Sequence, residues 1–255
     1  MTKTFVAVLA AMGTLAVLGL GPAEPAASAR PSAAPTPTGV LMIGDSTTKR
    51  VTPWLAEHHP SWHVDGQGGR PVRALGRRIE VYLSSHPAPA DFIMALGTNR
   101  SSHPEWTARR LARAIDKLPA ETNVYLMMVV RAGRFQAWKD AVLLDYNRMS
   151  RSLAKRRPNT WIIDWRGTVL NDPTLHRVTG RSRLLEDGTH QTGKPYGVSG
   201  PGVETYVRLI EEKLARHSTE PLDPDVAEDD PDAADDRGVR VPEVTGDWHP
   251  VAGSG

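Results

Sequence analysis

The sequence predicts an α/β protein in which a central parallel sheet of about five strands lies between two layers of helices. Short apolar runs, typical of buried strands, alternate along the chain with longer segments whose apolar residues recur at helical spacing. Such alternation favours parallel strands joined by helical crossovers. The size agrees, because 255 residues with 40% hydrophobic and 24% charged side chains suit one sizeable domain with tails.

The expected strands are apolar runs short enough to be buried on both faces of a sheet. They cover residues 40–43, 61–64, 92–96, 124–130 and 161–163. The second run is the weakest of them, since it contains His63. The first ends in Gly44 and the third in Gly97, which favours a turn directly after each strand.

The expected helices lie between these strands and after the last one. They cover residues 51–58, 72–83, 106–118, 138–153 and 203–214. Each has apolar residues along one side, as Leu75, Ile79 and Tyr82 show, which indicates packing against the sheet. Most of the seven tryptophans are expected in the core, although those at 54, 106 and 138 leave an aromatic wall beside a ligand as an alternative.

The N-terminus has the three parts of a secretory signal peptide. Lys3 precedes an apolar run, and Ala27, Ser28 and Ala29 form a cleavage-like site. We therefore expect a signal peptide at residues 1–29, cleaved after Ala29, a linker at 30–37 and a secreted protein without stable membrane insertion. An uncleaved N-terminal anchor is the alternative, although the run is shorter than the roughly 20 residues of a comfortable span.

The charges of the chain are unevenly distributed. Residues 218–255 hold eleven acidic and two basic residues with several prolines, so we expect an acidic, disordered tail. The domain before it, residues 38–217, is basic: residues 31–217 carry a net charge of +10. This favours an anionic cell-envelope surface as a partner, with an ordinary solvated surface as the alternative. No specific nucleic-acid partner is expected.

Four polar motifs follow the expected strands or precede the last helix. They are Gly44-Asp45-Ser46, the turn that contains Gly69, Gly97-Thr98-Asn99 and Asp187-Gly188-Thr189-His190. Taken singly, each has an ordinary explanation as a helix cap or a turn. Together they supply a nucleophile, hydrogen-bond donors, a base and a carboxylate to orient the base, which is what acyl transfer from an ester requires.

The ordered set of motifs resembles the four blocks of the SGNH (GDSL-like) hydrolases over about residues 38–217. Residues 64–70 also resemble the V-D-x-x-x-G-R form of the second block, familiar in secreted esterases and in extracytoplasmic domains of cell-envelope O-acyltransferases. The resemblance implies a flavodoxin-like three-layer α/β/α fold. It also implies that family members need neither a metal nor an organic cofactor.

The resemblance further implies roles for individual residues. Ser46 would be the nucleophile, His190 the base and Asp187 the residue that orients His190. The backbone N–H groups of Ser46 and Gly69 and the side-chain amide of Asn99 would form the oxyanion hole. The chain departs from many relatives at Arg100, which would make the rim of the pocket more basic, and in a long glycine-rich stretch at 193–202, a candidate substrate-side loop.

Other classes of site lack their residues. The chain has no cysteine, which excludes disulfides, thiolate metal sites and cysteine nucleophiles. It has no G-x-S-x-G elbow, no complete phosphate loop or dinucleotide fingerprint and no H-E-x-x-H zinc motif. His58, His59 and His63 have no carboxylate at a spacing that would complete a metal site, so a solvated loop is expected there.

We therefore expect a secreted serine esterase that hydrolyses carboxylic esters, with short acyl or acetyl groups on a small-molecule or glycan substrate. One alternative is an O-acyltransferase that acts on cell-envelope glycans. The other is an envelope-binding domain without catalytic activity.

Overall fold

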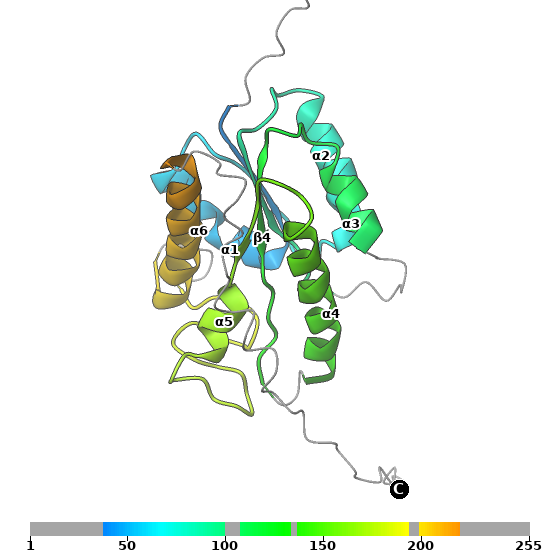
Figure 1. Cartoon of the computed structure of the whole chain (residues 1–255). Coiled ribbons are helices and arrows are strands. Elements are labelled where there is room, and N and C mark those ends of the chain that lie inside the picture. The colour runs from blue at the N-terminus through cyan, green and yellow to red at the C-terminus, as the bar shows by residue number, and fades with distance from the viewer. Residues whose placement is uncertain (1–37, 100–107, 134–136, 194–198, 220–255) are drawn as a thin grey trace, which may run out of the picture. The chain divides into compact units, whose positions relative to one another are not determined.

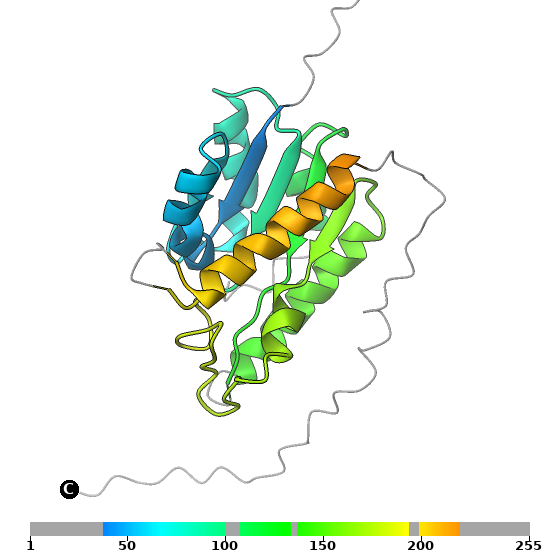
Figure 2. The ribbon, with the colours of Figure 1, turned by 90° about the vertical axis from the view of Figure 1, so that its left-hand side faces the viewer.

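Five apolar segments form one parallel sheet between two layers of helices in the computed structural model, which describes residues 38–99, 108–133, 137–193 and 199–219 (Figures 1 and 2). The strands are β1 (Val40–Gly44), β2 (His63–Gly66), β3 (Asp91–Ala95), β4 (Asn123–Met127) and β5 (Thr160–Ile163). All four pairings are parallel. The predicted three-layer α/β/α fold is thereby confirmed.

The strand order β2-β1-β3-β4-β5 places a change of direction at β1. The chain moves from β1 outward to β2 and then returns to the other side of β1 with β3. Gly44, at the end of β1, pairs with Gly66 of β2 and with Ala95 of β3, so these three strands end level with one another. In open α/β sheets, ligands bind at the carboxyl ends of strands at such a switch point.

Helices cover both faces of the sheet (Figure 1). They are α1 (Ser46–His58), the short 3₁₀ turn η1 (Val72–Ala74), α2 (Leu75–Leu83), α3 (Ala108–Ile115), α4 (Ala137–Ala154), α5 (Trp165–Leu170) and α6 (Pro201–Thr219). Two buried apolar clusters result, one under α2, α3 and α4 and the other under α1, α5 and α6.

Two elements begin or end away from their expected positions. The helix expected at 51–58 begins at Ser46, because the Asp45 side chain accepts a hydrogen bond from the Thr47 N–H and caps the first turn. The strand expected to reach Val130 ends at Met127. Beyond it, the backbone of Val129 is bound by the side-chain amide of Asn147 instead of by a neighbouring strand.

The remaining differences are small or concern a short helix. The second strand lies at His63–Gly66, two residues beyond the expected 61–64. Helix α5 was not expected, since six residues are too few to show a helical period. It is capped by Asp164, which accepts from the Gly167 N–H, and it buries Trp165 edge-on against Tyr206.

The burial of the tryptophans and the surroundings of the histidines can also be compared with the expectations. Trp54 and Trp161 are half-buried and pack against the core. The side chains of Trp106 and Trp138 lie outside the described part of the chain. The expected solvated loop at the three histidines is wrong for two of them, because His58 ends α1 and His63 begins β2, while His59 Nε2 lies 2.7 Å from Glu211 Oε1. The described residues contain no group of three or more side chains that could hold a metal ion.

The expected signal peptide at 1–29, the linker at 30–37 and nearly all of the acidic tail lie outside the described residues, and α6 extends to Thr219. Within the described ranges, no helix is long and apolar enough to cross a membrane.

Candidate active site

Ser46 is the first residue of α1, and only the helix cap Asp45 separates it from the end of β1. Gly44 makes this tight passage feasible, because a Cβ at that position would lie 1.7 Å from Thr48 Oγ1. The first turn of the helix is thus packed against the end of the strand. The N–H groups in the first turn of a helix lack intrahelical partners and favour negative charge nearby.

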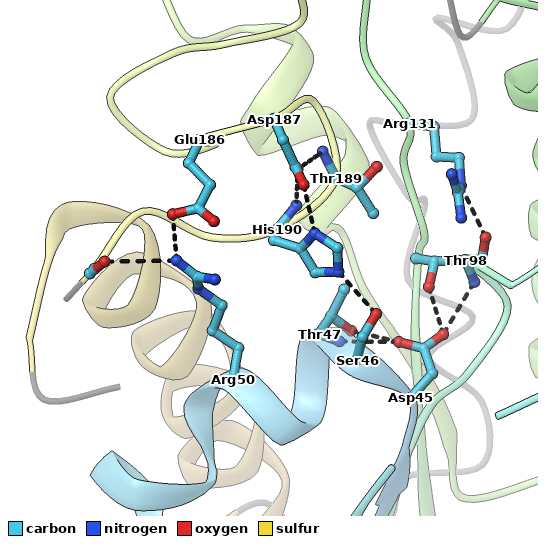
Figure 3. A network of polar contacts seen from close by, with 11 residues as sticks. Asp45, Ser46, Thr47, Arg50, Thr98, Arg131, Glu186, Asp187, Thr189 and His190 are labelled. Carbon is cyan, nitrogen blue, oxygen red and sulfur yellow. Dashed lines mark hydrogen bonds and ion pairs between the residues drawn. The ribbon is translucent and has the colours of Figure 1, made fainter. Parts of the chain in front are cut away.

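The buried carboxylate of Asp45 joins this helix start to the end of β3 (Figure 3). Its Oδ1 accepts from the N–H and the hydroxyl of Thr47, both at 3.0 Å. Its Oδ2 accepts from the N–H and the hydroxyl of Thr98, at 3.1 and 2.5 Å. The Thr98 carbonyl in turn accepts from Arg131 Nε at 2.8 Å. Asp45 therefore fixes the position of Ser46 relative to the segment that carries Asn99.

Ser46, His190 and Asp187 form one continuous hydrogen-bonded chain (Figure 3). Ser46 Oγ lies 2.9 Å from His190 Nε2, and His190 Nδ1 lies 2.7 Å from Asp187 Oδ2. If Asp187 is ionised, the proton of the neutral imidazole belongs on Nδ1, which leaves Nε2 free to accept the proton of Ser46. The structure thus brings together the three residues that the sequence singled out, although Ser46 and His190 are 144 positions apart.

The second oxygen of Asp187 holds its own turn in shape. Asp187 Oδ1 accepts the N–H groups of Thr189 and His190 at 2.9 and 2.8 Å. Partial burial acts to raise the pKa of Asp187, but these hydrogen bonds and the one to the His190 ring outweigh it and hold the pKa well below its usual range. Asp187 is therefore ionised wherever the protein is folded near neutral pH.

Contacts outside the triad fix the loop that carries His190. The Glu186 N–H donates to the His190 carbonyl at 3.0 Å, which closes the loop at its base. The Ala132 N–H donates to the Gly188 carbonyl at 2.7 Å. From α1, Arg50 Nη2 donates to the Glu186 carboxylate (Figure 3). Since Arg50 lies one helical turn after Ser46, this ion pair links the helix of the serine to the loop of the histidine.

The second motif is built around a nearly buried arginine. Arg70 is 4% exposed, and its Nη1 donates to the carbonyls of Gly44 and Asp65 at 3.1 and 2.5 Å. Its Nη2 donates to the Asp65 carboxylate at 2.5 Å. Burial acts to raise the pKa of Asp65, but hydrogen bonds from Arg70 and Arg78 outweigh it and lower the pKa. These hydrogen bonds of Arg70 fix the turn after β2 against the end of β1.

The expected oxyanion donors follow three neighbouring strands. Ser46 follows β1 and Asn99 follows β3, while Gly69 follows β2 on an exposed turn with φ of +72°. The Asn99 amide nitrogen is buried and has no hydrogen-bond partner within the described part of the chain. A buried donor without an acceptor costs free energy, so such an atom at a strand end suggests a ligand that supplies the acceptor. Arg100 and residues 194–198, where a basic rim and part of a substrate-side loop were expected, lie outside the described residues.

Sequence reasoning assigned no role to Asp45, Thr98, Arg131, Arg50 or Glu186. The first two lie inside the recognised motifs, so their position at strand ends was a usable signal. The ion pair of Arg50 and Glu186 spans 136 positions and has no local pattern that would reveal it.

No family model and no curated protein matches the chain. Solved structures do match. One is the C-terminal catalytic domain of Streptococcus pneumoniae peptidoglycan O-acetyltransferase A with a methylsulfonyl adduct. It is 19% identical with a TM-score of 0.58, and the match covers 72% of this chain and 97% of that one. Another is a member of the lipolytic G-D-S-L family from Veillonella parvula, with 15% identity, a TM-score of 0.53 and coverage of 72% and 100%. At these identities the comparisons show a shared fold, the one that the resemblance to SGNH hydrolases predicted.

Proposed function

We propose that the protein is a secreted serine esterase of the SGNH type that hydrolyses carboxylic esters with short acyl groups. The observation that carries the proposal is the chain from Ser46 Oγ through His190 to Asp187 at the switch point of the sheet. The buried amide nitrogen of Asn99 at the neighbouring strand end supports it, because this donor has no hydrogen-bond partner among the described residues.

The proposed reaction has two halves. Ser46 Oγ attacks the ester carbonyl while His190 Nε2 takes its proton, and the negative charge that forms on the carbonyl oxygen is held by the oxyanion donors. As the ester C–O bond breaks, His190 gives this proton to the leaving alcohol. His190 then takes a proton from a water molecule, whose oxygen attacks the acyl-serine, and the carboxylic acid leaves as the proton returns to Ser46.

O-acyl transfer is the second candidate, and the fold shared with an O-acetyltransferase domain favours it. The first half of the reaction is the same. In the second half, a hydroxyl group of an acceptor replaces water, so the acyl group forms a new ester instead of a free acid. Acylated sugar formed when an acceptor glycan is added distinguishes transfer from hydrolysis.

The test is hydrolysis of 4-nitrophenyl esters from C2 to C16 by the purified protein, beside Ser46→Ala. Serine-dependent activity that peaks at C2–C4 supports the proposal, and a peak at long chains redirects it to lipid esters. Absence of activity at every length, with no acyl transfer to added glycans, leaves the envelope-binding alternative.

The donor assigned to Asn99 has its own test. Asn99→Ala should lower kcat about 10²–10³-fold, the loss typical of one oxyanion donor. Asn123→Ala is the matched control, because the Asn123 amide donates to Asp91 at the amino-terminal ends of β3 and β4, away from the candidate site. A loss below threefold in Asn99→Ala removes this amide from the site.

A further inference from the structure

The segment between α5 and the His190 loop carries three exposed arginines, Arg177, Arg181 and Arg183. Its one acidic residue, Asp172, has a buried side chain, with Oδ1 at 3.7 Å from Arg183 Nε. Arg177 and Arg181 form no ion pair within the described ranges. Two exposed guanidinium groups without an ion-pair partner in the described part of the chain therefore lie on one short stretch.

Backbone contacts give this stretch a defined shape. The His176 N–H donates to the Arg181 carbonyl and the Gly180 N–H donates to the His176 carbonyl, both at 2.8 Å. These bonds close a turn over residues 176–181, which we call the arginine turn. The Thr179 N–H also donates to His176 Nδ1 at 3.2 Å. Both arginines thus start from fixed backbone positions.

The arginine turn is packed beside the loop of the triad. Gly180 lies so close to the segment at 132–133 that a Cβ there would be 2.1 Å from the Ala132 carbonyl oxygen. The same residue, Ala132, donates its N–H to the carbonyl of Gly188, which lies between Asp187 and His190 in the chain. One strip of backbone thus touches the arginine turn on one side and the triad loop on the other.

A hollow lies next to each of the two arginines. The first, of about 470 Å³, is a shallow depression lined by Arg181, Ser182 and Leu185 together with the acidic residues Glu186 and Asp187. The second, of about 570 Å³, is lined by Arg177 and by the apolar residues Leu170, Pro173 and Leu175, with Asn171, Asp172 and the backbone at 132–133 completing it. Volumes of this size accommodate small-molecule ligands or sugar units.

The carboxylates around the site contact partners other than Arg177 and Arg181. Asp45 is bound by Thr47 and Thr98, Glu186 by Arg50, and Asp187 by His190. Among the described residues, no carboxylate therefore forms an ion pair with the guanidinium group of Arg177 or Arg181. Guanidinium groups bind carboxylates and phosphates through paired N–H donors.

We propose that the arginine turn binds oxyanion groups of the substrate, carboxylate or phosphate, so that the natural substrate is an ester on an acidic polymer. This inference rests on the proposed esterase function and names its substrate class. An arginine beside each of two hollows suits a polymer with repeated negative charges better than a small ester with one.

The test compares three acetylated polymers: neutral xylan, polygalacturonate, which carries carboxylates, and poly(glycerol phosphate). The wild-type protein should have at least tenfold higher kcat/KM on one or both anionic polymers than on xylan. The better of the two identifies the oxyanion. The preference should shrink as salt is added, because salt screens exposed charges.

The variant Arg177→Gln/Arg181→Gln should lose this preference. We expect kcat/KM on the preferred anionic polymer, divided by kcat/KM on 4-nitrophenyl acetate, to fall tenfold or more through a higher KM. The matched control is Lys155→Gln/Arg156→Gln, which removes the same charge from exposed residues between α4 and the start of β5. In the control this ratio should stay within twofold of the wild-type value.

Equal hydrolysis of neutral and anionic polymers by the wild type, or equal ratios in the two variants, would overturn the inference. If no ester is hydrolysed at all, the proposed function fails, and the arginine turn is tested by binding. The intact protein should then bind unacetylated polygalacturonate or poly(glycerol phosphate) at least tenfold more tightly than Arg177→Gln/Arg181→Gln does. Equal binding by both proteins contradicts the inference.

Discussion

Replacing Asp45 by asparagine tests whether its carboxylate holds the site together. Each of its two oxygens accepts one backbone N–H and one hydroxyl. An asparagine presents an NH₂ group on one side, so whichever way it turns, one buried N–H of Thr47 or Thr98 faces a donor. A lost hydrogen bond to a charged acceptor costs about 1.5–3 kcal/mol. We expect Asp45→Asn to lower the free energy of unfolding by about 2–4 kcal/mol, since the facing donors also repel.

The assay is urea denaturation of both proteins, with Asp91→Asn as the matched control. Asp91 accepts from Asn123 and Tyr125 through the same oxygen, Oδ1, each at 3.0 Å. An asparagine there can keep its carbonyl oxygen toward both donors, so its cost should stay below about 1 kcal/mol. A loss in Asp45→Asn no larger than in Asp91→Asn would refute the reasoning about the two-sided acceptor.

Three further predictions concern the supports of the site. Gly44→Ala should destabilise the fold by about 1–3 kcal/mol or more, because the added Cβ collides with Thr48. Thermal unfolding measures this loss, and an unchanged midpoint would show that the start of α1 can shift. The pKa of Asp65 is lowered in the fold, so its contribution to stability is present above about pH 4 and is lost as the pH falls below that value. The difference in unfolding free energy between wild type and Asp65→Asn should therefore shrink from pH 7 to pH 3, and a constant difference would contradict the assigned ion pairs. Glu186→Gln should lower kcat about threefold to tenfold with little change in KM, because it weakens the ion pair with Arg50 that positions the His190 loop. A change confined to KM would instead assign the ion pair to substrate binding.

The layers of the fold could be predicted because strands and helices leave different periods in the sequence. Runs such as residues 92–96 are too short and too apolar for surface helices, and the stripe of Leu75, Ile79 and Tyr82 has helical spacing. The end of β4 could not be predicted in this way. Val129 and Val130 are as buried as the strand before them, but a side chain, Asn147, binds the backbone of Val129 there.

The candidate site residues were also visible in the sequence. Ser46, Gly69 and Asn99 each follow the carboxyl end of a strand, and parallel strands deliver such residues to one edge, whereas Asp187 and His190 were visible as a motif before the last helix. The supporting contacts were not. Arg50 and Glu186 become partners only after α1 and the His190 loop have packed together. Likewise, the arginine turn becomes part of the site only through backbone contacts with Ala132 and Gly188.

The identity of the nucleophile is tested most directly by the site at which a serine-directed reagent reacts. The protein should be incubated with phenylmethylsulfonyl fluoride, digested and analysed by peptide mass spectrometry. We expect one sulfonyl adduct, on Ser46, with parallel loss of esterase activity and strongly reduced labelling in His190→Ala. An adduct on another residue, or esterase activity that persists in Ser46→Ala, would show that Ser46 is not the nucleophile.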